Sequence, residues 1–335
     1  MKLNLSQIKS ITTGAVRIEE LSDGFHFYRF TAEQQEIYKN RNQDFYEKTF
    51  ATSGVKMCFN TNSTKLFLKT TVTRGSSRSY FAFDVFVNGK LYDALDNYSH
   101  LNLPLDYTKE VYQGGEFSKE FTFGAGEKEI CIYFPWSVAA VVNELSLDDG
   151  AVIESTKPTK KMVCYGDSIT HGYDALHPSN KYITKFSESL NAAEYNKGIG
   201  GEVYFPGLAS AKEDFLPDYI TVAYGANDCY CKSQDAFLED CKIFYENLDK
   251  SYKGVKTFVI TPIWRKDHAK QSAFGEFKMM YTAIKNIVSK YPNITVIDGY
   301  NLVEHNEEFF GDLRLHPNDK GFVQYFENIL KQLKA

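Results

Sequence analysis

The residues of this sequence that could do chemistry include a serine and a histidine that lie far apart in the chain. Ser168 ends a Gly-Asp-Ser tripeptide, and His316 directly precedes a proline near the C-terminus. A serine hydroxyl becomes a nucleophile when a neighbouring base takes its proton, and histidine exchanges protons near neutral pH. The two residues therefore predict attack on a carbonyl carbon, with Ser168 as the nucleophile and His316 as the general base.

Two further blocks offer hydrogen-bond donors for the negative charge that such an attack places on the carbonyl oxygen. One is the glycine-rich run 198–201, and the other contains Asn227 in a Gly-Ala-Asn-Asp sequence. Backbone N–H groups and neutral side-chain amides both suit this task. The structural alternatives are a sharp strand-to-helix turn for the glycines and an Asx turn for Asn227.

An acidic residue is expected to orient the histidine. Asp312 lies four residues before His316, and a carboxylate on the second ring nitrogen selects the productive tautomer and stabilises the imidazolium. A backbone carbonyl is the alternative partner for that nitrogen. His171, three residues after Ser168, is not expected to act as the base, because it would face along a helix away from the site.

Apolar runs of strand length alternate with runs of helix length after about residue 156. The predicted strands are 162–165, 194–196, 219–224, 257–260 and 295–297, and the predicted helices are 182–190, 236–251, 277–290 and 320–333. This alternation predicts a parallel sheet with helices on both faces, and such sheets bind ligands beyond the carboxyl ends of their strands. Three blocks follow the first three strands, and the fourth directly precedes the last helix. Helix capping alone would explain the serine block or the histidine block, but not this shared placement.

The first 155 residues follow a different pattern. Aromatic and β-branched residues recur with period two in the runs 65–72, 81–87 and 129–134. The step Asn88-Gly89 predicts a two-residue hairpin turn, because both of its central positions need positive φ. The pattern predicts an antiparallel β-sandwich domain over residues 1–155, with one possible short helix near 32–38. A polar linker over 154–161 then leads into a second domain over residues 156–335.

Composition and charge exclude several classes of partner. The formal net charge is -5, and the sequence lacks the clustered Lys and Arg that a nucleic acid would require. No apolar run is long enough to span a membrane, and the N-terminus has no signal-peptide pattern. We therefore expect neither a nucleic acid nor a membrane as partner, and a cytoplasmic location. The alternative is a secreted form that has lost its leader; a homo-oligomer is left open.

The six cysteines are expected to be free thiols, because a disulfide framework is typical of short secreted domains. Cys229 and Cys231 are separated by a single residue. They lack both the spacing and the further ligands of a zinc site. Neither a metal nor an organic cofactor is expected.

Together the four blocks resemble those of the SGNH (GDSL-like) hydrolase superfamily, whose motifs supply Ser, Gly, Asn and His in this order. The resemblance covers about residues 158–335 and implies a flavodoxin-like three-layer α/β/α fold. It implies that Ser168 is the nucleophile and His316 the base. It also implies an oxyanion hole formed by the backbone N–H groups of Ser168 and Gly201 and the side chain of Asn227.

Two positions in this resemblance have more than one candidate: the glycine of the oxyanion hole and the partner of the His316 ring. Gly201 is preferred to the other glycines because the functional glycine of the family follows the asparagine after the second strand, here Asn196, by about five residues. The family usually has Asp-x-x-His in its last block, but here Leu313 is three residues before His316 and Asp312 is four before it. We expect a loop that is one residue longer, from which Asp312 still reaches the ring. A backbone carbonyl takes this part in some carbohydrate-esterase relatives.

The first domain resembles the jelly-roll-like β-sandwiches that precede the SGNH domain in some bacterial carbohydrate esterases. This resemblance implies a serine esterase that removes short acyl groups, above all acetyl, from oxygen esters of a carbohydrate or small glycoside through an acyl-enzyme on Ser168. A lipase or thioesterase for longer acyl chains and a non-catalytic carbohydrate-binding or scaffold protein are the alternatives. The residues expected to line the substrate pocket are Tyr173, Tyr204, Trp264 and Arg265.

Overall fold

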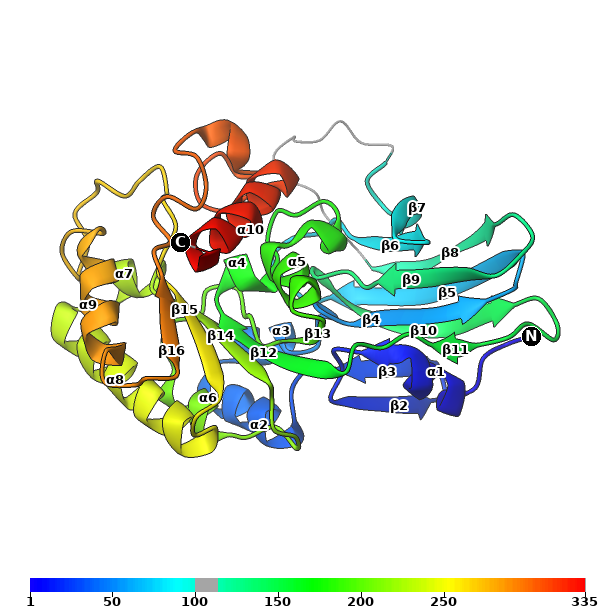
Figure 1. The fold of residues 1–335 in the computed structure, drawn as a ribbon, viewed down its shortest axis with the longest axis horizontal. Helices are drawn as coiled ribbons and strands as arrows, with labels where there is room; N and C mark the ends of the chain where they lie inside the picture. Colours follow the sequence, from blue (N-terminus) through cyan, green and yellow to red (C-terminus); the bar gives the residue numbers. More distant parts are fainter. Residues whose placement is uncertain (100–113, 335) are drawn as a thin grey trace.

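The structure is a computed structural model that describes residues 1–99 and 114–334. Antiparallel strands of the first part and a parallel sheet of the second part lie side by side along the long axis of the molecule (Figure 1). This arrangement confirms the predicted fold class, a β-sandwich followed by an α/β domain.

The β-sandwich consists of two antiparallel sheets. One has the strand order β2-β3-β10-β5-β8, and the other has the order β1-β4-β9-β6-β7 with β11 beside β4. The strands are β1 (Thr12–Thr13), β2 (Arg17–Leu21), β3 (Gly24–Tyr28), β4 (Lys56–Thr61), β5 (Lys65–Arg74), β6 (Ala82–Val87), β7 (Lys90–Asp96), β8 (Gly115–Thr122), β9 (Lys128–Tyr133), β10 (Val138–Leu147) and β11 (Glu154–Ser155).

The predicted period of two places alternate side chains in the core between these sheets. In β5, Leu66, Leu68 and Val72 are buried and pack in a core with residues of the other strands. The hairpin between β6 and β7 turns at Asn88 and Gly89, whose φ angles are 48° and 76°. Two positive φ angles in a two-residue loop are those of a type I′ turn, so the hairpin prediction is confirmed.

The second part contains one sheet of five parallel strands in the order β13-β12-β14-β15-β16. The strands are β12 (Lys160–Gly166), β13 (Ala192–Asn196), β14 (Tyr219–Ala223), β15 (Lys256–Ile260) and β16 (Ile294–Ile297). The order is that of flavodoxin-like folds, in which the chain reverses its direction across the sheet beside the first strand. All five strands overlap the segments predicted from the sequence.

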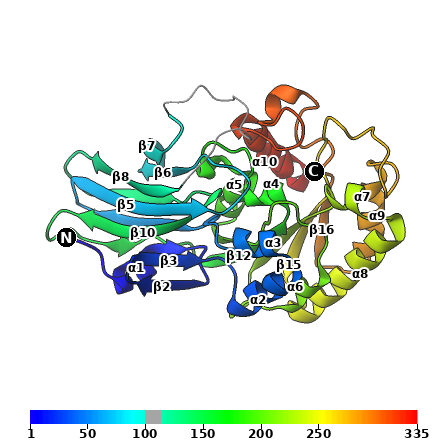
Figure 2. The ribbon, with the colours of Figure 1, turned by 180° about the vertical axis from the view of Figure 1, so that it is seen from behind.

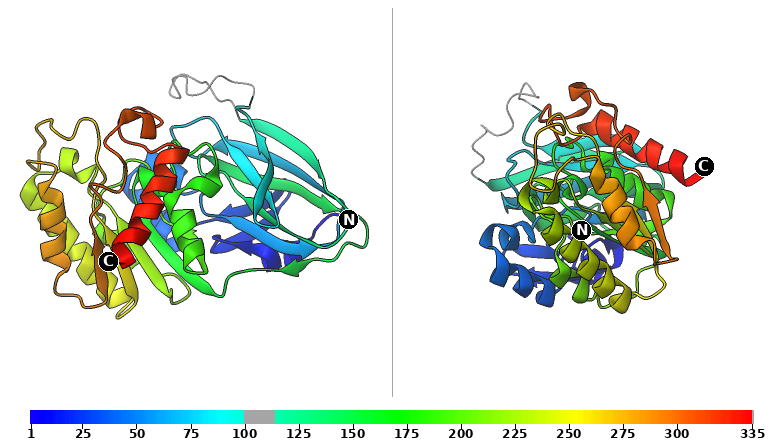
Figure 3. Two further views of the ribbon diagram at one scale, coloured as in Figure 1. Left: turned by 45° about the horizontal axis from the view of Figure 1, so that its top comes forward. Right: turned by 90° about the vertical axis from the view of Figure 1, so that its left-hand side faces the viewer.

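Helices cover both faces of this sheet. Successive residues of β12 point to opposite faces, so Cys164 packs in one core and Val163 in the other. Figure 3 shows α5 and α10 together on one face. The helices are α5 (Tyr182–Ser189) and α10 (Asp319–Lys334) on that face, and α6 (Pro206–Ser210), α8 (Gln234–Ser251) and α9 (Met279–Val288) on the other. The short helices are α4 (Ser168–His171), α7 (Asp228–Cys231), and the 3-10 turns η1 (Pro178–Asn180) and η2 (Glu307–Phe309).

The N-terminal part has more helix than the sequence predicts. Besides α1 (Leu5–Ile11), it forms α2 (Ala32–Arg41) and α3 (Gln43–Lys48), which begin at the capping residues Thr31 and Asn42. Figure 2 shows α2 and α3 beside the parallel sheet rather than on the sandwich. Helix α2 contains the short helix expected near 32–38, whereas α3 was not expected, because few apolar residues mark a helical period there. The division into residues 1–155 and 156–335 stays a prediction, since this early segment packs against the later part.

Two expectations for the sandwich were wrong. The segment predicted as a linker, 154–161, is not a free connection, because β11 pairs with β4 and β12 already begins at Lys160. Cys58 and Cys131 form a disulfide between directly opposed residues of β4 and β9, so not all six cysteines are free thiols. Opposed positions on neighbouring strands bring two Cβ atoms close enough for such a bond, a pairing that sequence spacing does not reveal.

Among the described residues, no helix is both long and apolar enough to cross a membrane.

Candidate active site

The candidate nucleophile lies at the carboxyl edge of the parallel sheet. Strand β12 ends at Gly166, and helix α4 begins at Ser168. The side chain of Asp167, not that of Ser168, caps this helix by accepting a hydrogen bond from the backbone N–H of Ile169. A Cβ atom at Gly166 would lie 2.1 Å from Oγ1 of Thr170, so the tight turn requires glycine. The Ser168 hydroxyl is thereby left for other contacts.

His316 reaches this hydroxyl from the loop before α10. Its Nε2 lies 2.8 Å from Ser168 Oγ, and its Nδ1 lies 2.8 Å from Asp312 Oδ2. Ser168 is 4% exposed and His316 is 8% exposed. The three side chains form one series of hydrogen bonds, which is the geometry that lets a histidine take a proton from a serine.

The loop that carries Asp312 is shaped by that residue. Asp312 Oδ1 accepts hydrogen bonds from the backbone N–H groups of Arg314, Leu315 and His316, and Leu313 has a φ of 55°. These bonds close a loop with one residue more than Asp-x-x-His. Burial alone would raise the pKa of Asp312, but the hydrogen bond and charge of His316 and the backbone donors outweigh it and hold that pKa below its ordinary value. The carboxylate is therefore ionised at neutral pH.

The glycine-rich loop and Asn227 also meet at this edge. The side-chain amide of Asn227 donates a hydrogen bond of 2.8 Å to the backbone oxygen of Glu202, the residue after Gly201. Gly201 has a φ of 90°, a conformation that other residues rarely adopt. One hydrogen of the Asn227 amide is thus used to hold the loop, which leaves its second hydrogen for another acceptor.

Three cations from residues 29–48 hold the same loop from the N-terminal side. Arg29 donates to the backbone oxygens of Asn196 (2.8 Å) and Gly198 (3.3 Å), and Lys48 donates to that of Gly200 (2.9 Å). Arg41 binds both carboxylate oxygens of Glu202, at 2.7 and 2.9 Å. These residues were not predicted, because nothing in the sequence links a cation in the first 50 residues to a loop near residue 200.

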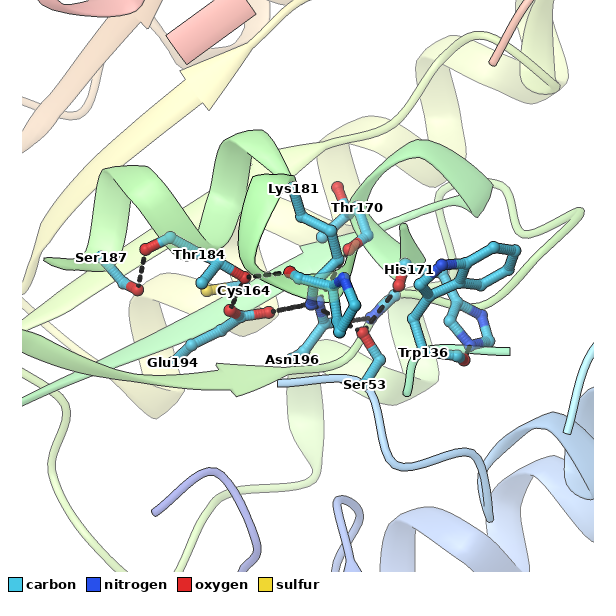
Figure 4. A network of polar contacts seen from close by, with 12 residues as sticks. Ser53, Trp136, Cys164, Thr170, His171, Lys181, Thr184, Ser187, Glu194 and Asn196 are labelled. Carbon is cyan, nitrogen blue, oxygen red and sulfur yellow. Dashed lines mark hydrogen bonds and ion pairs between the residues drawn. The ribbon is translucent and has the colours of Figure 1, made fainter. Parts of the chain in front are cut away.

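A buried polar network ties α4 to the N-terminal part (Figure 4). Lys181 donates to Ser53 Oγ (2.9 Å) and to Glu194 (2.8 Å), and Ser53 donates to the backbone oxygen of His171 (2.6 Å). Burial alone would raise the pKa of Glu194, but Lys181 and neighbouring hydrogen bonds outweigh it and lower that pKa. The backbone carbonyl of His171, the last residue of α4, thus accepts a hydrogen bond from a buried donor. This bond fixes the position of the short helix that begins with Ser168.

His171 takes no part in the hydrogen-bond series of Ser168. Its Nε2 donates to the backbone oxygen of Trp136 (2.8 Å), and burial lowers its pKa well below the ordinary value. Its Nδ1 has no hydrogen-bond partner within the part of the chain that the structure describes. The imidazole is a neutral, fully buried group that packs between the two parts of the molecule.

The four residues expected to line a pocket differ in their placement. Tyr173 lies against His316, with ring centroids 5.3 Å apart. Trp264 stacks on His305, and Arg265 donates to the backbone oxygen of Ala226 (3.0 Å), next to Asn227. The expectation for Tyr204 was wrong. It is buried in the core below α8 and its hydroxyl bonds that of Tyr245, because an aromatic residue after a loop packs inward when an apolar face lies beneath it.

A serine, a histidine and an aspartate that are hydrogen-bonded in series at the carboxyl edge of a parallel α/β sheet form an arrangement used by hydrolases with a serine nucleophile. Residues 164–322 match the model of the GDSL-like lipase/acylhydrolase family. This match identifies that part of the chain as a GDSL-like lipase/acylhydrolase domain, and the protein is a carboxylic ester hydrolase.

Solved structures match the architecture along nearly the whole chain. A salicylyl-acyltransferase from a tetracycline biosynthetic pathway superposes with a TM-score of 0.78 at 18% identity, over 97% of this chain and 94% of that one. A candidate GDSL-like lipase from Bacteroides ovatus ATCC 8483 gives 0.74 at 20% identity, over 98% and 96%. An acetyl xylan esterase from the rumen bacterium Butyrivibrio proteoclasticus gives 0.64 at 13% identity, over 100% and 97%. These likenesses concern the fold. Comparison with curated proteins gave no match.

Proposed function

We propose that this protein is a serine esterase that hydrolyses short-chain oxygen esters, acetyl esters above all, on a carbohydrate or small glycoside. The observation that carries the chemistry is the series of hydrogen bonds from Ser168 through His316 to Asp312, each 2.8 Å long. The substrate class is supported by the likeness in fold to an acetyl xylan esterase and to family two carbohydrate esterases, one of which is described with a carbohydrate-binding domain.

In the proposed reaction, Ser168 Oγ attacks the ester carbonyl carbon while His316 Nε2 takes the hydroxyl proton. The carbonyl oxygen becomes an oxyanion, held by the backbone N–H groups of Ser168 and Gly201 and by the Asn227 amide. His316 then passes its proton to the oxygen of the leaving alcohol, and an acyl-enzyme remains on Ser168. Water attacks this ester with His316 again as the base, which releases the acid and restores the hydroxyl.

A series of nitrophenyl esters of increasing acyl length tests the proposed substrate class. We expect kcat/KM to be highest for acetyl and to fall by about tenfold or more by eight carbons, because a site adapted to an acetyl group would exclude a longer acyl chain sterically. Acetate release from an acetylated oligosaccharide, measured in parallel, checks the carbohydrate part. A preference for acyl chains of about eight carbons or more would instead support a lipase or thioesterase.

The hydrogen bond from Lys48 to the glycine-rich loop leads to a second prediction. Lys48→Met removes the donor to the Gly200 oxygen but keeps the length of the side chain. We expect kcat for nitrophenyl acetate to fall roughly tenfold with KM nearly unchanged, because a misplaced oxyanion donor weakens binding of the transition state more than that of the substrate. Lys39→Met, at an exposed position of the neighbouring helix α2, is the matched control. Equal kcat in the two variants would contradict the positioning role.

A further inference from the structure

A second carboxylate lies near His316. Asp174, in the turn after α4, is fully buried and has a φ of 68°, which is unusual for a residue other than glycine. Its Oδ2 is 3.7 Å from His316 Nδ1, whereas Asp312 Oδ2 is 2.8 Å from the same atom. A distance of 3.7 Å is too long for a hydrogen bond but short enough for a strong charge interaction in a buried place.

The other side of Asp174 is held by the β-sandwich. Arg78 donates from Nε to Asp174 Oδ1 (2.6 Å) and from Nη2 to Oδ2 (3.2 Å), and the hydroxyl of Tyr80 donates to Oδ1 (3.2 Å). Both donors lie between strands β5 and β6. The guanidinium also lies 5.3 Å from the centre of the Tyr173 ring, and that ring packs on His316. Arg78 of the β-sandwich part thus contacts both Asp174 and Tyr173, which lie beside His316.

An ion pair that only docks the two parts of the molecule would explain Arg78 and Asp174, but not where the carboxylate lies. Docking does not require a strained residue or a carboxylate directed at an imidazole. Buried carboxylates are costly unless they are paired, and a left-handed backbone is disfavoured for residues other than glycine, although less so for aspartate than for most. Both costs recur at sites where geometry serves a function.

We propose that Asp174 is a positioning residue that shares with Asp312 the stabilisation of the charged form of His316, and that the β-sandwich sets its place through Arg78 and Tyr80. The inference rests on the proposed function of His316 as the general base. When His316 takes the Ser168 proton at Nε2, the Nδ1 proton stays between the ring and Asp312. Asp174 receives no proton and contributes its negative charge.

Several ionisable groups surround His316, and a titration must separate their effects. Asp312 comes from its own loop, Asp167 from the turn after β12, and Tyr173 and Asp174 from the chain after α4, with Arg78 behind them. Burial raises the pKa of Asp167 to about 7, despite opposing contacts from a backbone N–H and His316. Because Asp167 is the same in all the variants compared, differences between variants report on Asp174.

The test is an NMR titration of His316 in protein labelled with ¹³C at histidine Cε1, with its signal assigned as the one missing from His316→Gln. In Asp174→Asn we expect the midpoint of this titration to fall by about half a pH unit or more, because an imidazolium that loses a nearby negative charge releases its proton at lower pH. The acid limb of kcat/KM should move in the same direction. Asp84→Asn is the matched control, since Asp84 is also a buried carboxylate that joins the two parts, through His177 and Ser179. It should leave the midpoint unchanged.

Arg78→Met provides a second measurement. Without the Arg78 cation, the negative charge of Asp174 is no longer partly neutralised and acts more strongly on His316. The midpoint of the His316 titration should therefore rise, whereas it should fall in Asp174→Asn. A midpoint that stays at the wild-type value in Asp174→Asn would overturn the proposal. If Asp174→Asn does not fold, a His316 midpoint in Arg78→Met that is unchanged or lower than in the wild type would overturn the proposal instead. The titration needs no turnover, so a protein without esterase activity would refute the proposed function while the link between Asp174 and His316 is still measured.

Discussion

Replacing Ser168 by alanine is expected to lower kcat/KM for a short-chain ester by about a thousandfold or more, because no acyl-enzyme can then form. The hydroxyl oxygen lies 2.8 Å from His316 Nε2, and it is Asp167, not Ser168, that caps helix α4. The melting temperature should therefore stay close to that of the wild type. Steady-state kinetics and a thermal melt of the same preparation measure the two effects.

An organophosphonate provides a test of the nucleophile that does not depend on the ester chosen. The Ser168 oxygen should displace the leaving group from phosphorus, which adds the phosphonyl mass to one peptide of the wild type and none of Ser168→Ala. Ser187→Ala is the matched control, because Ser187 is another buried serine at a helix, bonded to the backbone oxygen of Thr184. A folded wild type that takes up no label would favour the non-catalytic scaffold.

His316→Ala should cause a loss of similar size, about a thousandfold or more, because Ser168 then has no base to take its proton. Combining it with Ser168→Ala should lower the rate little further, since the members of such a site act as a unit. His26→Ala is a suitable control, because His26 lies in β3 of the sandwich and bonds Asp23. Turnover near the wild-type value in His316→Ala would mean that another group takes the proton.

The fold could be predicted from the sequence wherever local pattern and tertiary structure agree. The strands of the parallel sheet are short apolar runs between helices of clear amphipathic period, such as α10. The hairpin at Asn88 was predictable because its turn type demands particular residues. The residues proposed for catalysis were identified by the same logic, since strand ends bring Ser168 and Asn227 to one edge of the sheet.

What sequence reasoning missed depends on contacts between distant segments. Three such features are the packing of α2 and α3 beside the parallel sheet, the pairing of Cys58 with Cys131, and the placement of Arg78 against Asp174. In each, the residues carry no local sign of their partner. A cation that holds a loop has the same residue type as a solvated surface cation. Tyr204 shows the converse error, because a residue close to a site in sequence can still turn into the core.

The contacts that Arg29 makes with the loop after β13 have a consequence for the time course of biosynthesis. Arg29 and the backbone oxygen of Asn196 are 167 residues apart in the chain. At a typical synthesis rate the ribosome adds that many residues in roughly ten to thirty seconds. During this interval the emerging N-terminal helices have no sheet to pack on, and His316 follows later still. Until the sheet has been synthesised, the nascent chain therefore carries the α2 and α3 segment without the surface that it packs on in the folded protein.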